Sequence, residues 1–344
     1  MSRLLLAPME GLADDVLRDV LTCVGGRVGG YDQAVTEFVR VSGNLLPNRA
    51  FMRISPELRH GGRTSVGTPV VVQLLGSDPA CMAANAARVA QLLPPAIDLN
   101  FGCPAPCVNR HRGGAALLGE PELLNAIVSA VRAAVPAVIP VTAKMRLGIA
   151  DTSLAIDCAT ALTEGGAESL VVHARTKEQG YKPPAHWEWI AAIRDAVRVP
   201  VIANGEVWNV ADWQRCRAVS GCDDVMLGRG AVSDPYLVRR IRGLAEPVAS
   251  EAEWQALLPA IAAFWRGVQA KVEARHAPGR LKLWLGYLRR TWPQAEALHA
   301  AIRPLRTPVE VTALLTRLVP MAFAETMAAV GAVASGQCSL RDAA

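Results

Sequence analysis

Asp98-Leu99-Asn100-Phe101-Gly102-Cys103-Pro104 closes an apolar, strand-like stretch of the chain and presents a thiol near its end. Pro104 restricts the backbone just after Cys103, and Gly102 allows a close approach to whatever binds there. A cysteine on such a turn can transfer a proton or attack a substrate, although a free cysteine is also common as a small buried hydrophobe. The turn therefore indicates chemistry only if other strands end in polar residues beside it.

Eight short apolar runs alternate with Ala-rich segments of helical periodicity. Apolar strands alternating with helices are typical of a parallel sheet that is buried on both faces. Eight such units in about 240 residues match an α/β fold of the (β/α)8 TIM barrel type, which typically has ~250 residues. A doubly wound open sheet is the alternative, because the second run is faint and residues 25–31 are irregular. The predicted strands are Leu4–Pro8, Gln33–Thr36, Val70–Leu75, Ile97–Asn100, Val141–Met145, Ser169–His173, Val201–Asn204 and Asp224–Leu227.

The predicted strands end in polar residues. Any one of these could cap a helix or reach solvent, but seven strand ends in the same position favour a common site. Active sites of such barrels lie at the carboxyl ends of the strands. We therefore predict a site at this rim, formed by Glu37, Gln73, Asn100, Lys144, His173, Asn204 and Arg229.

The pattern changes after about residue 243, where strand signals stop and amphipathic helical segments follow. We predict a barrel domain over 1–242 and a small, all-helical C-terminal domain over 243–344. Within 264–306, nine Lys and Arg stand against two Glu, a net charge of +7. One helix in this segment has an apolar stripe of Leu281, Trp284, Leu285 and Leu288. The basic residues beside the stripe are either a solvated face or contacts to phosphate and stacked bases.

Composition limits the class of protein. The chain has 344 residues, of which 51% are hydrophobic, and a net charge of +5, which is compatible with a nucleic-acid partner. The apolar run near the start is too short for a secretory signal, and no run approaches the roughly 18–20 residues of a membrane span. We expect a cytoplasmic, monomeric protein whose eight cysteines are reduced.

The loops after the last two strands favour a phosphorylated ligand. Asn204-Gly205-Glu206 and Gly228-Arg229-Gly230 combine glycines, which expose backbone N–H groups, with a fixed guanidinium. Rim amides can bind the edge of a flat heterocycle, and Lys144 beside such a ring would stabilise negative charge on it. Flavin mononucleotide (FMN) meets all these demands. A Lys144 Schiff base in an aldolase-type barrel is the competing use.

The chain resembles the tRNA-dihydrouridine synthases over nearly the whole barrel. That family has an FMN-binding barrel followed by a helical tRNA-binding domain, and it reduces uridine in tRNA with NADPH as the reductant. The motifs that carry the resemblance, in order, are Ala7–Gly11, Thr36–Arg40, Asp98–Pro104, Lys144–Gly148, His173–Tyr181, Asn204–Glu206 and Gly228–Gly230.

The resemblance implies roles for the residues that match these motifs. Cys103 is the implied general acid, which protonates C5 of a uracil while hydride reaches C6. The implied FMN ligands are Pro8, Met9, Glu10, Gln73, Lys144, His173, Asn204, Gly205, Glu206, Gly228 and Arg229.

The resemblance also implies a base that leaves its stack to lie over the flavin. The chain is most similar to the bacterial C-type members, which implies the D-loop uridine at tRNA position 16. Asn100, Arg175 and Tyr181 would hold the extruded uridine or its phosphate. The residues implied to orient tRNA are Arg40, Arg280, Lys282, Tyr287 and Arg303.

Some residues depart from the family. Ala105-Pro106-Cys107 stands where many members have a lysine, and the basic loop Asn109–Gly114 is expected to contact RNA phosphate. Cys103 and Cys107 have no partners that complete a metal site, so we expect no metal. Two other functions stay open: an FMN barrel acting on a small pyrimidine, of the dihydroorotate type, and an RNA-binding barrel without chemistry.

Overall fold

A computed structural model describes residues 2–109, 113–318 and 320, without the side chains of residues 107 and 109. The chain divides into two compact units, Met1–Ala245 and Glu246–Ala344.

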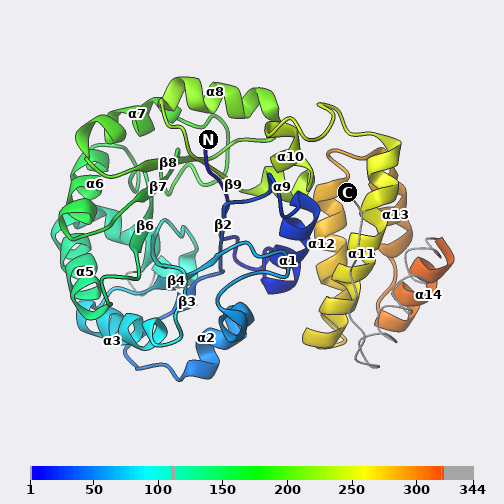
Figure 1. The fold of residues 1–344 in the computed structure, drawn as a ribbon, viewed down its shortest axis with the longest axis horizontal. Helices are drawn as coiled ribbons and strands as arrows, with labels where there is room; N and C mark the ends of the chain where they lie inside the picture. Colours follow the sequence, from blue (N-terminus) through cyan, green and yellow to red (C-terminus); the bar gives the residue numbers. More distant parts are fainter. Residues whose placement is uncertain (1, 110–112, 319, 321–344) are drawn as a thin grey trace. The chain divides into compact units, whose positions relative to one another are not determined.

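The first unit is a closed barrel of parallel strands (Figure 1). The strand order is β2-β1-β9-β8-β7-β6-β5-β4-β3, and the pairing of β2 with β4 closes the ring. This confirms the predicted TIM barrel and rules out the open sheet, in which β2 and β4 would not complete a ring. The strands are β1 (Leu4–Leu6), β2 (Gln33–Val35), β3 (Val39–Arg40), β4 (Val70–Leu75), β5 (Ile97–Phe101), β6 (Val141–Arg146), β7 (Leu170–His173), β8 (Val201–Asn204) and β9 (Val225–Leu227).

All eight predicted strands are present; β4 and β8 have the predicted bounds, and the other six differ from the prediction by one or two residues. The additional strand, β3, has two residues and pairs with the carboxyl end of β4, Val39 with Leu74 and Arg40 with Leu75. Two residues are too short a run to show a strand period in sequence. β3 places Arg40 beside the last residue of β4.

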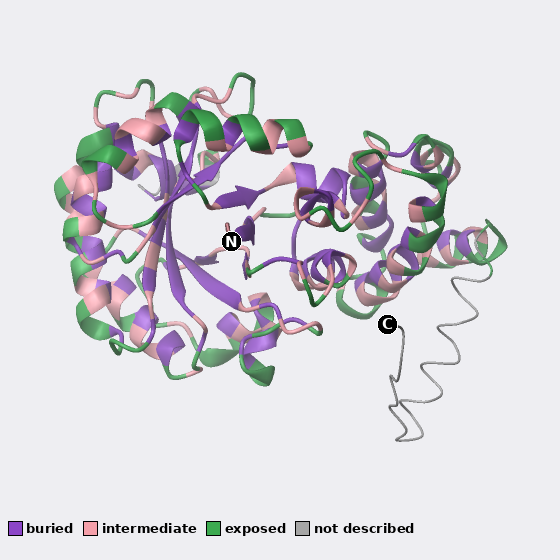
Figure 2. Ribbon diagram, turned by 45° about the horizontal axis from the view of Figure 1, so that its top comes forward, coloured by how far each residue is buried: buried purple, intermediate pink, exposed green. Residues whose placement is uncertain are grey.

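Helices cover the outside of the barrel (Figures 1 and 2). α5 shows why: Leu124, Ile127, Val128 and Val131 recur at helical spacing and are all buried. Side-chain caps begin three of the helices, α1, α3 and α8. The helical elements of this unit are α1 (Asp15–Gly25), α2 (Asn48–Ile54), η1 (Pro56–His60), α3 (Pro79–Ala90), α4 (Pro106–Asn109), η2 (Gly114–Gly119), α5 (Pro121–Ala134), α6 (Ala155–Glu164), α7 (Trp187–Ala196), α8 (Val210–Ser220), α9 (Arg229–Ser233) and α10 (Leu237–Ile241).

The barrel interior changes from apolar to polar along the strands. A buried apolar cluster includes Val71 on β4, Val171 on β7 and Ile202 on β8. Side chains in a strand alternate between faces, so the residue two positions later points to the same side. Those later positions are Gln73, His173 and Asn204, and all three are buried. The strands thus build an apolar base beneath a polar rim.

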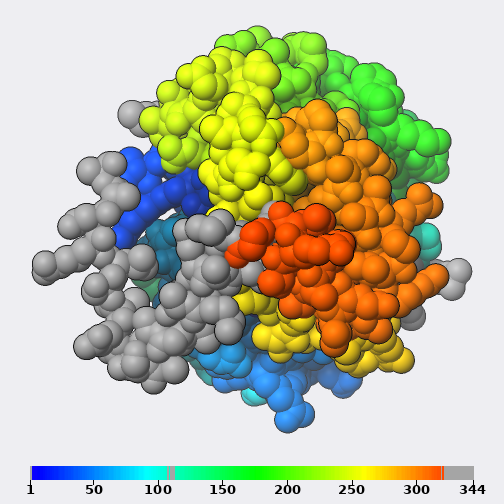
Figure 3. Space-filling model, turned by 90° about the vertical axis from the view of Figure 1, so that its right-hand side faces the viewer, coloured from blue at the N-terminus to red at the C-terminus, as the bar shows by residue number. Residues whose placement is uncertain are grey.

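The second unit is helical over its described residues, with α11 (Glu251–Lys271), α12 (Ala277–Leu288), α13 (Pro293–Ile302) and α14 (Pro308–Leu318). Ser250 and Glu253 form a capping box at the start of α11. The stripe predicted on α12 is confirmed as its buried face, and Trp284 packs edge-on against Phe264 at 4.9 Å between ring centroids. Figure 3 views these helices from outside. None of the helices described is long and apolar enough to cross a bilayer.

Candidate active site

The predicted rim residues meet because neighbouring strands end in register. Asn100 on β5 is paired with Lys144 on β6, and His173 on β7 is paired with Asn204 on β8. In a parallel sheet, paired residues point to the same face. The four side chains therefore converge at the carboxyl end of the barrel, as the sequence predicts.

The Cys103 turn is held by hydrogen bonds on both sides. Oδ1 of Asn100 accepts the backbone N–H groups of Gly102 and Cys103, each at 2.9 Å, and the Cys103 carbonyl accepts the Ala115 N–H at 3.0 Å. Gly114 has φ +62°, and a Cβ there would come within 2.7 Å of the Cys103 carbonyl oxygen. The thiol is half-buried, so the turn presents it at a fixed place with access from outside.

The pKa of Lys144 lies close to neutral pH. Its Nζ donates to Oδ1 of Asn204 at 3.1 Å, and Asn204 Nδ2 donates to the carbonyl of Met226 at 2.9 Å. Burial, and then the charge of Arg146, lower the pKa of Lys144 to about 8, while Asp98 opposes the shift. An anionic ring beside Lys144 would favour its charged form.

His173 is a neutral imidazole at physiological pH. Burial, with the charges of Arg146, Lys144, Arg175 and Arg229 in addition, lowers the pKa of His173 well below its ordinary value. Its Nδ1 is buried and has no hydrogen-bond partner among the described residues. A buried ring nitrogen without a partner favours a ligand that would bond to it.

Gly205 lies against this imidazole. It has φ +120°, and a Cβ there would lie 3.3 Å from Cδ2 of His173. Any other residue would therefore be strained in the backbone and crowded against the ring. The Gly205 carbonyl accepts Nε1–H of Trp187 at 3.0 Å, which fixes the turn after β8.

Two guanidinium groups lie over the ring of Tyr181. Arg146 and Arg229 lie 5.1 Å and 4.8 Å from its ring centroid, and its ring is 5.9 Å from that of His173. Tyr181 is 53% exposed, so one part of the ring is open to a binding partner. Arg229 also lies 5.2 Å from the ring of Trp208.

Arg146 is a site residue that the sequence analysis did not assign. It donates to the carbonyls of Gly102, Thr176 and Gly180 at 2.7, 3.0 and 2.8 Å, and so joins the Cys103 turn to the loop of Tyr181. Its position two residues after Lys144, on the same face of a strand, was the available signal. Trp208, whose Nε1 donates to Glu206 at 2.9 Å, was also missed.

Arg175 is completely buried and forms an ion pair with Glu206. Burial lowers its pKa to about 10, with the charges of Arg229 and Arg146 as lesser causes. Its Nη1 has no hydrogen-bond partner within the described part of the chain. The interaction of Arg175 with a uridine phosphate stays a prediction, since the guanidinium lies behind the rim surface.

The loop after β1 carries the three residues Pro8, Met9 and Glu10. The Met9 carbonyl accepts the N–H groups of Leu12 and Ala13. The Gly11 N–H donates to Glu37 at 2.6 Å. The loop is thereby tied to the end of β2. Gly228 follows β9 and precedes α9, beside the same rim.

The residues predicted to orient tRNA are divided between the units. Arg40 is on β3 of the first unit, whereas Arg280, Lys282 and Tyr287 lie half-buried on α12. Lys282 Nζ donates to the Leu305 carbonyl at 2.6 Å. Arg303, which follows α13, is exposed.

Part of the basic loop lies outside the described residues, namely Arg110, His111 and Arg112, and so does the Cys107 side chain. The contact of this basic loop with RNA phosphate stays a prediction. Six cysteines are described as thiols rather than disulfides: Cys23, Cys81, Cys103, Cys158, Cys216 and Cys222. In the described ranges, no group of three or more His, Cys, Asp or Glu could hold a metal ion.

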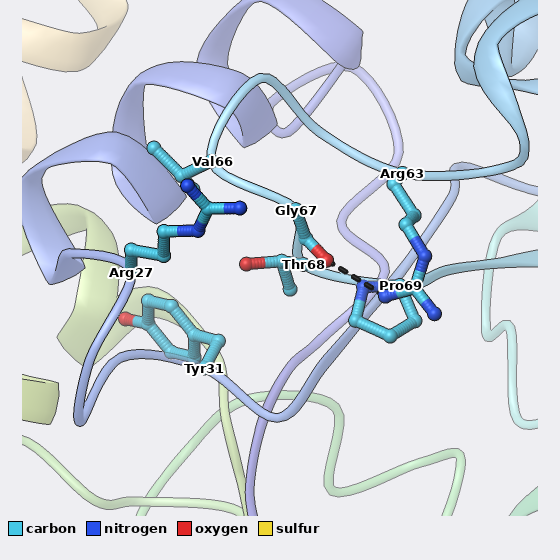
Figure 4. Close-up of a pocket in the computed structure, with 7 residues that line it drawn as sticks. All are labelled: Arg27, Tyr31, Arg63, Val66, Gly67, Thr68 and Pro69. Carbon is cyan, nitrogen blue, oxygen red and sulfur yellow. Dashed lines mark hydrogen bonds between the residues drawn. The ribbon is translucent and has the colours of Figure 1, made fainter.

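A separate cavity of about 430 Å³ lies at the opposite end of the barrel, before β2 and β4 begin (Figure 4). Arg63 donates to the Gly67 carbonyl at 2.8 Å at its edge. None of the predicted site residues lines it. Its lining is Arg27, Tyr31, Arg63, Val66, Gly67, Thr68 and Pro69.

Solved structures share the barrel. This chain matches a 2-naphthoyl-CoA reductase complex with a TM-score of 0.54 and 11% identity, over 70% of this chain and 50% of that one. It matches histamine dehydrogenase from Rhizobium sp. 4-9 with a TM-score of 0.51 and 14% identity, over 77% and 48%. The chain spans about half the length of each, and these likenesses show the fold alone.

Sequence comparisons are more specific. The chain is 65% identical to a tRNA-dihydrouridine(16) synthase of Ralstonia nicotianae, over 92% of this chain and 95% of the relative. It is 64% identical to the protein of the same name from Cupriavidus necator, over 92% and 98%. The family model described as dihydrouridine synthase (Dus) matches residues 5–283. With its barrel, its rim and these relatives, the chain belongs to the dihydrouridine synthase family.

Proposed function

We propose that this protein reduces the C5–C6 double bond of uridine 16 in the tRNA D-loop, which yields 5,6-dihydrouridine. The observation that carries the proposal is the Cys103 turn, which presents a thiol at the barrel rim beside Asn100 and is joined to Tyr181 through Arg146. The relatives named for this reaction support the position of the target uridine.

We propose FMN as the cofactor. The rim offers groups that fit it: the buried Nδ1 of His173 is without a partner among the described residues, and the Lys144 ammonium lies at the strand ends, where it donates to Asn204. Arg175 is proposed to hold the uridine or its phosphate instead. When bound, FMN would supply hydride, and NADPH would return the oxidised flavin to its reduced form. Lys144 would stabilise charge on the ring, and Arg229 and Gly228 would hold the phosphate. The other implied ligands are Pro8, Met9, Glu10, Gln73, Asn204, Gly205 and Glu206.

Cys103 supplies the proton in this scheme. A thiol on a fixed turn can deliver it to one face of C5, and reduction is complete when both C5 and C6 carry a new hydrogen. Asn100 and Tyr181 hold the extruded base, and Arg146 keeps the Cys103 turn and the Tyr181 loop together.

The tRNA is bound through positive charge. Residues 264–306 carry a net +7, and Arg289, Arg290, Arg303 and Arg306 are exposed within them. A small pyrimidine would need no such segment, which argues against a dihydroorotate-type substrate. We propose that Arg40, Arg280, Lys282, Tyr287 and Arg303 orient the tRNA on a monomeric, cytoplasmic enzyme.

The direct test is to incubate the purified protein with NADPH and unmodified tRNA, and to map dihydrouridine by position. We expect dihydrouridine at position 16 alone. Dihydrouridine elsewhere would contradict the proposed orientation. A yellow protein that NADPH reduces but that leaves tRNA unchanged would instead support the small-pyrimidine reaction, and a colourless protein would support an RNA-binding barrel without chemistry.

A further inference from the structure

A row of three polar side chains crosses the barrel interior just below the rim. Gln73 on β4 is paired in register with Asp98 on β5, and Asp98 is paired with Thr142 on β6. Asp98 Oδ1 accepts the Thr142 hydroxyl at 2.6 Å, and Oδ2 accepts Nε2–H of Gln73 at 2.7 Å. Gln73 and Asp98 are 0% and 3% exposed, so water cannot readily replace either partner.

This row continues toward the rim, to the Cys103 turn. Oε1 of Gln73 accepts Nδ2–H of Asn100 at 2.7 Å, and Oδ1 of Asn100 accepts the N–H groups of Gly102 and Cys103. A continuous chain of hydrogen bonds therefore runs from Thr142 to the backbone of Cys103. Gln73, Asp98 and Thr142 are brought together by the register of the three adjacent strands β4, β5 and β6, and not by the Cys103 turn.

The direction of every bond in the chain follows from the carboxylate. Burial raises the pKa of Asp98, while the hydrogen bonds from Gln73 and Thr142 and the charge of Lys144 oppose the shift. Both carboxyl oxygens accept in the two bonds, so Gln73 turns its NH2 group toward Asp98 and its oxygen toward Asn100. Asn100 must then turn its own NH2 group toward Gln73 and its oxygen toward the two backbone donors. Reversal of either amide would set donor against donor inside the barrel, at the cost of a buried unsatisfied group.

We propose that Asp98 and Thr142 are positioning residues, which lock the amides of Gln73 and Asn100 and thereby hold the Cys103 turn where it meets the substrate. Neither of the two reaches the reacting atoms. Thr142 holds Asp98 from β6, and Asp98 sets the orientation of the two amides. The proposal rests on the proposed function only in the assay of tRNA reduction, in which Cys103 is the proton donor.

The first test needs neither cofactor turnover nor tRNA. Thr142→Val keeps the shape of the side chain and removes the donor to Asp98, whereas Thr142→Ser keeps the donor. We expect amide hydrogen exchange, measured by mass spectrometry on peptides covering 99–105, to rise about 10-fold in Thr142→Val and to stay near wild type in Thr142→Ser.

Thr22→Val is the matched control. Thr22 is completely buried, whereas Thr142 is half-buried, and the Thr22 hydroxyl donates to the Asp19 carbonyl at 3.0 Å within α1, away from the rim. It should leave exchange over 99–105 unchanged. Equal exchange in Thr142→Val and wild type, or an equal rise in Thr22→Val, would overturn the proposal.

The second test separates the two half-reactions. Reduction of the flavin by NADPH does not use the thiol, whereas single-turnover reduction of tRNA by the pre-reduced enzyme does. We expect Thr142→Val to slow the tRNA step about 10-fold and to slow flavin reduction by a smaller factor, because only Gln73 of this row is also an implied FMN ligand. An equal loss in both steps would indicate a merely structural role and would overturn the proposal.

Asp98→Asn provides a second variant if Thr142→Val folds poorly. The amide introduced by this substitution has one acceptor and one donor where Asp98 has two acceptors, so one of the neighbouring bonds is lost or reversed. We expect the same rise in exchange over 99–105, and wild-type exchange would count against the proposal. A wild-type protein that fails to reduce tRNA would contradict the proposed function and leave the exchange test intact.

Discussion

Lys144 Nζ donates to Oδ1 of Asn204 at 3.1 Å, and this bond joins β6 to β8 across the end of β7. Asn204 is fixed in turn, because its Nδ2 donates to the Met226 carbonyl of β9. The ammonium therefore has a rigid acceptor, and burial keeps its pKa near 8. A residue so poised responds strongly to any anion that binds beside it.

Lys144 should make stability depend on alkaline pH in the flavin-free protein. Its pKa is about 8 when folded, against an ordinary 10.5, so between these values the unfolded chain binds more protons than the folded one. The free energy of unfolding should thus rise from pH 8 to 10.5, on the order of 1 kcal/mol per pH unit from this group. Urea titrations at several pH values measure the slope. Lys144→Met should flatten it, and parallel curves for the two proteins would contradict the pKa.

Cys103→Ala should retain the flavin and lose tRNA reduction, by roughly the 10²–10⁴-fold expected for a missing general acid. Its effect should fall on the tRNA step alone, since flavin reduction by NADPH does not require the thiol. Stopped-flow absorbance follows the two steps separately. Cys23→Ala, which removes an exposed thiol on α1, is the control. Normal tRNA reduction by Cys103→Ala would exclude this thiol as the proton donor.

Arg229→Ala should weaken flavin binding, because the guanidinium would lose its role at the cofactor phosphate. A lost charge-assisted bond corresponds to about 10- to 100-fold in affinity. The measurements are flavin content per protein and fluorescence titration of the flavin-free enzyme. Arg215→Ala is a matched control, because Arg215 also lies over an aromatic ring, that of Trp187 at 5.5 Å, but on α8. Unchanged affinity in Arg229→Ala would remove this residue from the phosphate site.

Reversal of Arg280 and Lys282 to Glu should weaken tRNA binding and reduce its dependence on salt. Each lost phosphate contact lowers the log–log slope by about 0.7–0.9. Filter binding between about 50 and 200 mM salt covers the range in which this effect is large. Thermal unfolding is measured in parallel, because Lys282 also bonds to the Leu305 carbonyl.

The control for this experiment is Arg27→Glu with Arg63→Glu. Both arginines are exposed, and they flank the cavity at the opposite end of the barrel from the rim. The double reversal makes the same change in net charge without touching the α12 residues. An equal loss of slope in both double variants would leave only a general effect of charge.

The neutral state of His173 has a further consequence at low pH. Because its folded pKa lies well below the ordinary 6.5, the unfolded chain takes up a proton there that the folded chain does not. Stability should therefore fall as the pH drops below about 6.5, where the unfolded imidazole becomes charged. Chemical denaturation at about pH 7, 6 and 5 in wild type and His173→Gln tests this, and an equal fall in both would refute it.

Much of the fold and of the rim was accessible from sequence because both rest on local patterns. Apolar runs of strand length between amphipathic helices predict a parallel barrel, and a polar residue at each strand end predicts one shared rim. Gln73, Asn100, Lys144, His173 and Asn204 follow from that rule alone. The apolar stripe of α12 was likewise visible, because helical spacing is a property of neighbouring residues.

The residue types at the strand ends, and their order, can be predicted from the sequence because strand and helix periods are local. The partners of these residues depend on how the strands pair in the folded barrel. The closure of β2 on β4, the stacking of Arg146 and Arg229 on Tyr181, and the row from Thr142 to Gln73 all depend on register between strands far apart in the chain. Register is set by packing of the whole barrel, so it cannot be predicted from a pattern of neighbouring residues.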